Sequence, residues 1–141
     1  MSKGLEQLDV LLGEWTSSSK KYPEGRGRMT VAPTEGGKFV RIAARIEDER
    51  FPESTQIVGS DEVRDECTAL CYDSRGMHRV YRMTVDSGIW QAWREAPKFN
   101  QRYIGHIKDG GKTIEGQWEF SEDGKSWEVD FDISYTKVVA G

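Results

Sequence analysis

The sequence has little of what several common classes of protein require. Its 141 residues include two histidines, two cysteines and four prolines, and the 24 acidic residues outnumber the 20 basic ones. The net charge of −4 argues against a nucleic-acid-binding protein, because such proteins present a basic face to phosphates. The longest basic run, Lys20-Lys21, is too short to change this conclusion. We therefore expect no nucleic-acid partner.

Long apolar runs are missing as well. No stretch approaches the ~20 apolar residues that a membrane helix requires. The first residues, Met1 to Gln7, contain no apolar segment of the kind found in signal peptides. These absences predict a protein that has no membrane partner and is located in the cytoplasm.

The scarcity of cysteine and histidine limits the chemistry. Cys67 and Cys71 are not spaced as CxxC. On a single strand, four residues would separate them by roughly 13 Å, too far for a disulfide, so a pair of buried, reduced thiols is expected. His78 and His106 lack the His-x-His or Asp-x-His spacing of metal ligands. The sequence therefore predicts no metal site and no cofactor.

What the chain does contain is a regular succession of strand-like segments and turn residues. Its length fits one domain covering residues 1–141. Nine clusters rich in Gly, Asp, Glu or Pro divide the chain after Gly13 into ten strands. These clusters are Glu24–Gly27, Glu35–Gly37, Asp48–Pro52, Asp61–Asp65, Asp73–Gly76, Asp86–Gly88, Glu95–Asn100, Asp109–Gly111 and Glu122–Gly124.

The short connections define the topology. Most span about three to seven residues, too few for a parallel crossover, so neighbouring strands should pair antiparallel. A long meander removes its exposed edges most simply by closing on itself. The predicted fold class is therefore all-β, an antiparallel meander barrel of about ten strands with one short N-terminal helical turn. That turn, at Leu5 to Leu12, places leucines on one face and should plug one end of the barrel.

The last hairpin shows the clearest alternation of apolar and polar residues, with a period of two. We expect its apolar set to face inward: Ile114, Gly116, Trp118 and Phe120 in one strand, and Trp127, Val129, Phe131, Ile133 and Tyr135 in the other.

Two further strands carry polar residues on their more apolar faces. In Met77–Val85 that face includes Arg79, Tyr81 and Met83, and in Gln101–Ile107 it includes Gln101 and Tyr103. A solidly packed core rarely admits an arginine. These strands therefore favour a barrel with an internal cavity, and they place His78 and His106 outside.

Gly13-Glu14-Trp15 follows the helical turn and begins the first strand. This placement resembles the Gly-x-Trp motif of the calycin superfamily, which includes the lipocalins. The resemblance implies that Trp15 closes the base of the barrel and packs under a basic side chain from the last strand. Lys137 is the residue expected to fill that role.

The stretch from Gly59 to Tyr135 is similar to a bacterial family of small calycin-like proteins that is classified as a domain of unknown function. The phrases that carry the similarity are Tyr72–Gly76, Arg79-Val80-Tyr81, Trp90 with Trp93-Arg94, Gln101-Arg102-Tyr103 and Asp130 through Tyr135. This resemblance implies a barrel and a bacterial source, but no particular reaction.

Two other calycin branches differ from this chain. Nitrobindin-like proteins share the phrase Leu11 to Trp15 but hold haem through a late histidine, and no histidine follows His106 here. Fatty-acid-binding proteins hold a carboxylate with an Arg-x-Tyr pair. Arg79-Val80-Tyr81 has that spacing, although it lies in mid-chain rather than on the final strand.

The leading functional hypothesis is a binding protein for a small apolar or amphipathic ligand with an anionic or polar group. Arg79 and Tyr81 would lie roughly 7 Å apart on one face and hold the charged group. Aromatic side chains would form the walls. Trp90 and Trp93 cannot both point inward on a regular strand. The expected ligand-binding residues are Arg79, Tyr81, Met83, Trp93, Gln101, Tyr103, Trp118 and Phe131.

Two alternatives remain open. The same cavity suits a cofactor-free enzyme of the cyclase, isomerase or dehydratase type, in which Tyr81 or Tyr103 acts as an acid and Arg79 stabilises an oxyanion. The second alternative is a filled barrel that interacts with other proteins, for instance as a homodimer through a sheet face. Arg79 is also open to pairing with an Asp or Glu of a neighbouring strand, in which case it would not hold a ligand.

Overall fold

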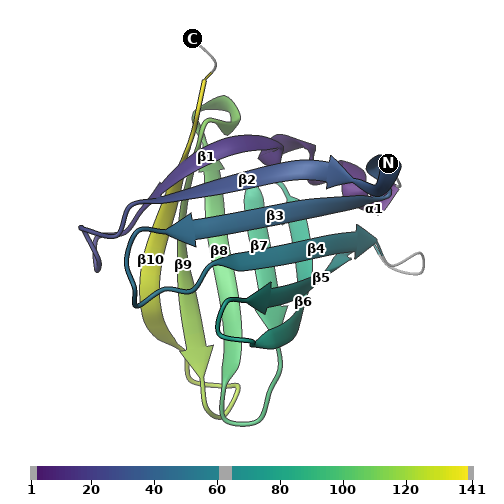
Figure 1. The fold of residues 1–141 in the computed structure, drawn as a ribbon. Coiled ribbons are helices and arrows are strands. Elements are labelled where there is room, and N and C mark those ends of the chain that lie inside the picture. The colour runs from purple at the N-terminus through teal and green to yellow at the C-terminus, as the bar shows by residue number, and fades with distance from the viewer. Residues whose placement is uncertain (1–2, 61–64, 140–141) are drawn as a thin grey trace.

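The computed structural model describes residues 3–60 and 65–139. Ten strands form a closed antiparallel barrel (Figure 1). They are β1 (Gly13–Ser18), β2 (Gly27–Thr34), β3 (Phe39–Ile46), β4 (Ser54–Ser60), β5 (Cys67–Asp73), β6 (His78–Asp86), β7 (Ile89–Arg94), β8 (Asn100–Lys108), β9 (Thr113–Ser121) and β10 (Glu128–Lys137). Short helical segments are α1 (Lys3–Glu6), η1 (Asp9–Leu11), η2 (Glu35–Gly37) and η3 (Asp109–Gly111).

Each strand pairs with its neighbours in the chain, and β1 pairs with β10 to close the barrel. This arrangement confirms the predicted all-β meander barrel. The predicted breaks lie at strand junctions, except that the cluster Asp61–Asp65 lies outside the described residues apart from Asp65. Among the described residues, no helix is both long and apolar enough to cross a membrane.

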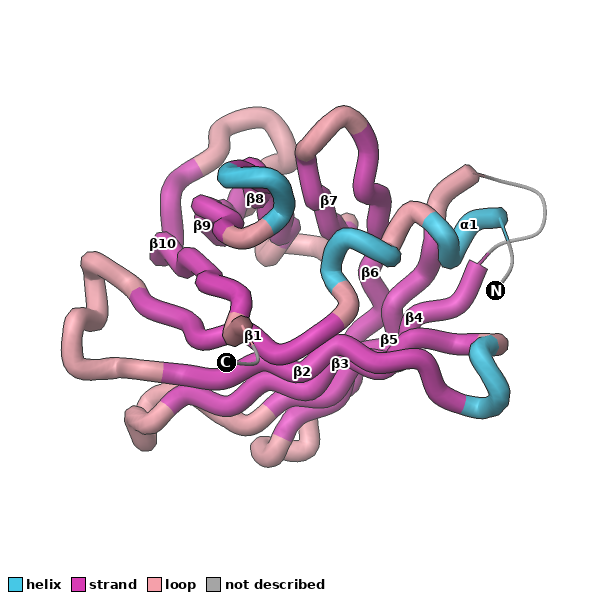
Figure 2. The backbone as a smooth tube through the Cα atoms, turned by 90° about the horizontal axis from the view of Figure 1, so that it is seen from above, coloured by secondary structure: helices cyan, strands magenta, loops and turns pink. Residues whose placement is uncertain are grey.

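The N-terminal segment plugs one end of the barrel, as expected. The side chains of Leu5, Leu8 and Leu11 are completely buried, and η1 lies across the space between β1 and β6 when the barrel is viewed from above (Figure 2). The segment is two separate turns rather than one helix over Leu5 to Leu12. Leucines spaced by three residues align on one face of a 3₁₀ turn, so this short form buries all three.

Trp15 and Lys137 form the base of the barrel at the plugged end. They are directly paired between β1 and β10, and the Lys137 ammonium lies 5.4 Å from the centre of the Trp15 ring. The Trp15 indole N–H donates to the carbonyl of Leu11 at 2.8 Å. Gly13 has a φ of 129°, and a Cβ there would lie 3.1 Å from Lys137 Cε. The contact expected between Trp15 and a basic residue is therefore confirmed.

A β-bulge in β10 changes which residues face inward. The register with β9 shifts between Val129 and Phe131, so the residues before the bulge exchange faces. Val129 is paired with Glu119 on the outer surface and is 58% exposed, and the Trp127 ring lies 4.0 Å from the guanidinium of Arg102, outside the barrel. The inward orientation expected for Trp127 and Val129 is therefore wrong. Ile133 and Tyr135, beyond the bulge, are buried as expected.

Candidate functional site

The barrel contains an internal cavity of about 190 Å³. It extends from the β3–β4 loop at the open end to the buried rings near the plugged end. Seventeen residues line it: Met29, Ile42, Ala44, Ile46, Phe51, Pro52, Ser54, Gln56, Tyr81, Met83, Trp90, Ala92, Tyr103, Trp118, Phe131, Ile133 and Tyr135. The lining is mainly apolar and aromatic, which is typical of small-molecule sites.

Aromatic rings form one wall of this cavity. The Tyr103 ring lies 5.0 Å from Trp90 and 5.4 Å from Trp118, measured between centroids. Tyr81 meets Trp118 edge-on at 5.7 Å. These edge-on and tilted contacts suit the ring quadrupoles and hold the rings in fixed positions. The cavity therefore has a rigid wall of flat apolar surfaces.

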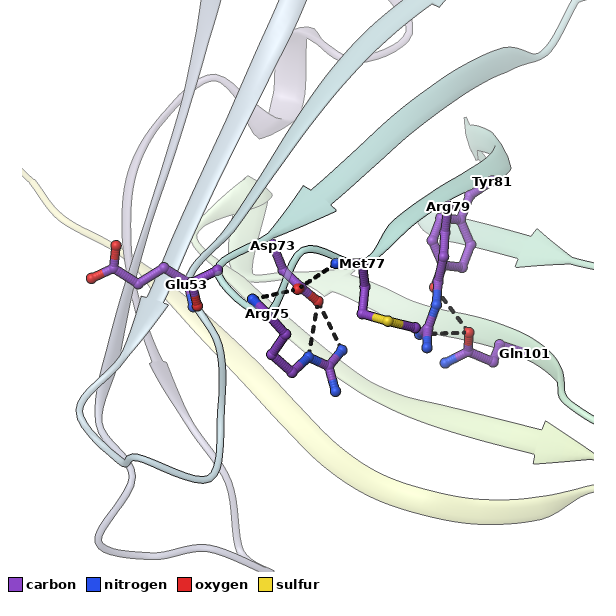
Figure 3. Close-up of polar contacts among 8 residues, drawn as sticks. Glu53, Asp73, Arg75, Met77, Arg79, Tyr81 and Gln101 are labelled. Carbon is purple, nitrogen blue, oxygen red and sulfur yellow. Dashed lines mark hydrogen bonds and ion pairs between the residues drawn. The ribbon is translucent and has the colours of Figure 1, made fainter.

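A polar cluster lies at the edge of the cavity, where strands β6 and β8 approach the open end (Figure 3). The Tyr81 hydroxyl donates to Gln101 Oε1 at 3.0 Å, and Arg79 Nη1 donates to the same oxygen at 3.2 Å. Because Tyr81 also lines the cavity, it connects the interior with the guanidinium of Arg79. Both donors use the side-chain oxygen of Gln101. The amide N–H groups of the same side chain can therefore donate to another acceptor.

No Asp or Glu among the described residues pairs with Arg79. The nearby carboxylate of Asp73 receives Arg75 Nη2 at 2.7 Å instead, and it also accepts the backbone N–H groups of Arg75 and Met77 (Figure 3). The Arg75 guanidinium holds the pKa of Asp73 below its usual range. The Arg79 guanidinium instead meets the Gln101 oxygen, lies beside the Tyr81 hydroxyl and faces the Phe99 ring, 5.6 Å from its guanidinium carbon.

Arg94 is a second arginine at this edge that the sequence analysis did not identify. It is paired with Gln101 between β7 and β8, and it is half-buried. Within the described parts of the chain its guanidinium has no hydrogen bond or ion pair. Its positive charge, like that of Arg79, helps to lower the pKa of Tyr81. Alternation places Arg94 on the same face of β7 as Trp90 and Ala92, but only the structure identifies that face as the inner one.

Burial determines the protonation of the two candidate tyrosines. It raises the pKa of Tyr81 above its usual value, and the nearby Arg79 only partly opposes this effect. Burial raises the pKa of Tyr103 well above its usual value. Both phenols are therefore neutral hydrogen-bonding groups at physiological pH, far from the pKa that efficient proton transfer requires.

The structure brings most of the expected site residues together. Tyr81, Met83, Tyr103, Trp118 and Phe131 line the cavity, and Arg79 and Gln101 lie at its edge. Trp93 was expected to bind the ligand inside the barrel, and this expectation is wrong. Trp93 lies on the outer face of β7, paired with Arg82 and Arg102 and with its ring 5.6 Å from the Arg82 guanidinium.

Trp90 takes the inward place that Trp93 was expected to occupy, because Trp90 and Ala92 share the buried face of β7. Sequence analysis also missed Tyr135 as a cavity residue, although it had placed Tyr135 on the inner face. Both residues line the cavity from the halves of β7 and β10 that are nearer the plugged end.

The remaining candidates do not form a second site. His78 and His106 are exposed, as their strand faces predicted. In residues 3–60 and 65–139, no three His, Cys, Asp or Glu side chains gather as metal ligands would. A larger hollow of about 790 Å³ lies on the outer surface around Gln7 and Arg82. Its lining is mostly polar, so it does not enclose an apolar ligand.

Comparison of the chain with models of known protein families, and with curated proteins, found no match. The geometry of the cavity and of its polar edge therefore carries the functional argument.

Proposed function

We propose that the protein binds a small, largely apolar ligand with one anionic group inside its barrel. The observation that carries this proposal is the pairing of Arg79. Its guanidinium meets an uncharged Gln101 rather than a carboxylate, at the edge of an apolar cavity. A partly buried cation without a counter-ion favours an anionic ligand.

The volume of the cavity limits the size of the ligand. An apolar protein cavity of about 150 Å³ holds one benzene molecule, and this cavity measures about 190 Å³. One aromatic ring or a comparable aliphatic group fits the interior. A short chain would then carry its acid to Arg79, Tyr81 and Gln101 at the edge.

The calycin relationship supports the same function. A closed ten-strand antiparallel barrel, with a Trp at its base under Lys137, matches what the Gly13-Glu14-Trp15 resemblance implied. We include membership of the calycin superfamily in the proposal. A bacterial source and a cytoplasmic location stay predictions from the sequence.

Binding is favoured over the two alternatives for physical reasons. The raised pKa values of Tyr81 and Tyr103 make these phenols poor general acids near neutral pH. An interior with room for a ring also differs from the filled barrel that the protein-interaction alternative assumes.

A matched pair of probes tests the proposal. The acid 3-phenylpropanoate and the neutral alcohol 3-phenylpropan-1-ol are titrated into the protein by calorimetry. We expect Arg79→Met to weaken binding of the acid by about 10- to 100-fold, the range for a hydrogen bond to a charged group. Binding of the alcohol should change little.

Arg28→Met is the control, because Arg28 lies at the same end of the barrel but is exposed on the outer face of β2. It should leave both affinities unchanged. Absence of saturable binding by the acid, or equal losses for acid and alcohol in Arg79→Met, would contradict the proposal.

A further inference from the structure

Two polar groups in the cavity wall have no hydrogen-bond partner within the described chain. They are the indole N–H of Trp90 and the hydroxyl of Tyr103. The two residues are 4% and 2% exposed, and both line the cavity. Nearly all buried polar groups in proteins are hydrogen-bonded, so two unpaired donors in one wall require an explanation.

These groups lie deeper than the Arg79 cluster. The Tyr103 side chain extends along β8 from the open end, and its hydroxyl lies close to where a Cβ of Gly105 would be, at 2.8 Å. Gly105 is four residues beyond Gln101, a distance of roughly 13 Å along a strand. The Trp90 ring is in contact with Tyr103 and lies 6.0 Å from Tyr135.

Phenylalanine at both positions would provide similar apolar walls without unpaired donors. Leaving a buried donor unpaired is unfavourable, whereas an acceptor from a ligand removes that penalty. The arrangement is therefore costly in the empty barrel and favourable when a ligand oxygen accepts from these two donors.

We infer that the inner end of the cavity is a second polar subsite, which binds a hydroxyl or carbonyl oxygen of the ligand. This inference rests on the proposed function and specifies its ligand class. The ligand carries an acid at one end, an oxygen at the other and one ring between them. The carboxylate meets Arg79, the ring lies against Trp118, and the distal oxygen accepts hydrogen bonds from Trp90 and Tyr103.

Two probes of similar size separate this subsite from simple apolar contact. They are 3-(4-hydroxyphenyl)propanoate and 3-(4-methylphenyl)propanoate, which differ only in the group that would reach the inner end. The native protein should bind the hydroxyl compound between about 5-fold and 100-fold more tightly, the range for satisfying a buried donor.

The double variant Trp90→Phe/Tyr103→Phe keeps both rings and should reduce this preference to about twofold or less. Trp93→Phe, on the outer face, should keep the full preference. Because Phe removes unpaired polar groups, we expect the double variant to fold, and its circular dichroism and melting temperature verify this. In ¹⁵N-resolved spectra, the Trp90 indole signal should shift with the hydroxyl probe and much less with the methyl probe.

Equal binding of the two probes by the native protein would overturn the inner subsite but leave the acid-binding proposal intact. A preference retained by the folded double variant would also overturn it. Failure of both acids to bind would instead contradict the proposed function itself.

Discussion

The hydroxyl end of Tyr103 occupies the space in which a Cβ of residue 116 would lie. Gly116 is paired with Gly105 between β9 and β8, and both glycines lie under the Tyr103 side chain. The missing side chains allow Tyr103 to lie flat along the barrel wall. This close approach places its hydroxyl against the backbone of β8 and β9, beyond Gln101 on the side away from the open end.

Replacing Gly116 with Ala should therefore destabilise the protein by about 1–3 kcal/mol, the usual cost of overpacking. The new methyl group would displace Tyr103, so binding of 3-phenylpropanoate should weaken as well. Urea unfolding and calorimetry measure the two effects.

A double-mutant cycle with Tyr103→Ala separates this contact from other causes. The cost of Gly116→Ala should decrease in the Tyr103→Ala background, because the ring is then absent. The decrease should be partial, since the added Cβ would still lie 2.9 Å from the carbonyl oxygen of Ile104. Additive effects of the two substitutions would show that the ring does not determine the requirement for glycine.

Trp93 on β7 and Trp118 on β9 should differ in their effects on binding. Trp93→Phe should leave the affinity for 3-phenylpropanoate within about twofold, because Trp93 packs on Arg82 outside the barrel. Trp118→Leu should weaken binding about tenfold, because it removes an aromatic wall. A large loss in Trp93→Phe would contradict the orientation of β7.

Local patterns in the sequence were sufficient to predict the number of strands, the meander and the inward face of β6. Turn residues and alternation act over a few positions, and short connections permit only antiparallel neighbours. Arg79, Tyr81 and Met83 could therefore be placed on one face before the structure was known.

The faces of β7 and β10 depended on information that is not local. Ile89–Arg94 has an aromatic residue on each face, so periodicity alone could not choose between Trp90 and Trp93. The bulge after Val129 depends on the pairing of β10 with β9. The pairing of Asp73 with Arg75 depends on the geometry of the β5–β6 turn. Each of these features requires the three-dimensional structure.

The two cysteines should differ in reactivity. Burial raises the pKa of the Cys67 thiol to about 11, so only about one molecule in a thousand carries the thiolate at pH 8. Its side chain is also completely buried. Cys71 is only half-buried, and Arg79 helps to lower the pKa of its thiol, although burial raises that pKa overall.

We therefore expect iodoacetamide to label Cys71 first under native conditions and Cys67 only on unfolding, as measured by mass spectrometry. Cys71→Ser should leave a protein that is nearly unlabelled until urea is added, and Cys67→Ser should be labelled in the folded state. Equal rates in the two variants would contradict the burial of Cys67.

Asp132 should contribute to stability in a pH-dependent manner. Its carboxylate accepts the backbone N–H groups of Lys20 and Lys21, at 2.7 and 3.1 Å, and the hydroxyl of Ser19 at 3.0 Å. These bonds hold the loop that follows β1 against strand β10. Partial burial raises the pKa of Asp132, but the hydrogen bonds outweigh it, and the net pKa is below the usual value of 3.8.

A carboxyl group whose pKa is lowered in the folded state stabilises the protein at pH values above its unfolded pKa. That contribution decreases as the pH falls below 3.8 toward the lower folded value. Asp132→Asn should therefore lower the free energy of unfolding by about 1 kcal/mol at pH 7, a modest value because water screens this partly exposed group.

The difference between the native protein and Asp132→Asn should shrink progressively below pH 3.8, as followed by urea unfolding at several pH values. Asp130→Asn is the matched control, because Asp130 lies two residues from Asp132 and accepts from Lys21 through its backbone carbonyl, which the substitution keeps. It should leave the stability almost unchanged at every pH. If the effect of Asp132→Asn were the same at pH 3 and pH 7, the carboxylate charge would not be what holds the loop.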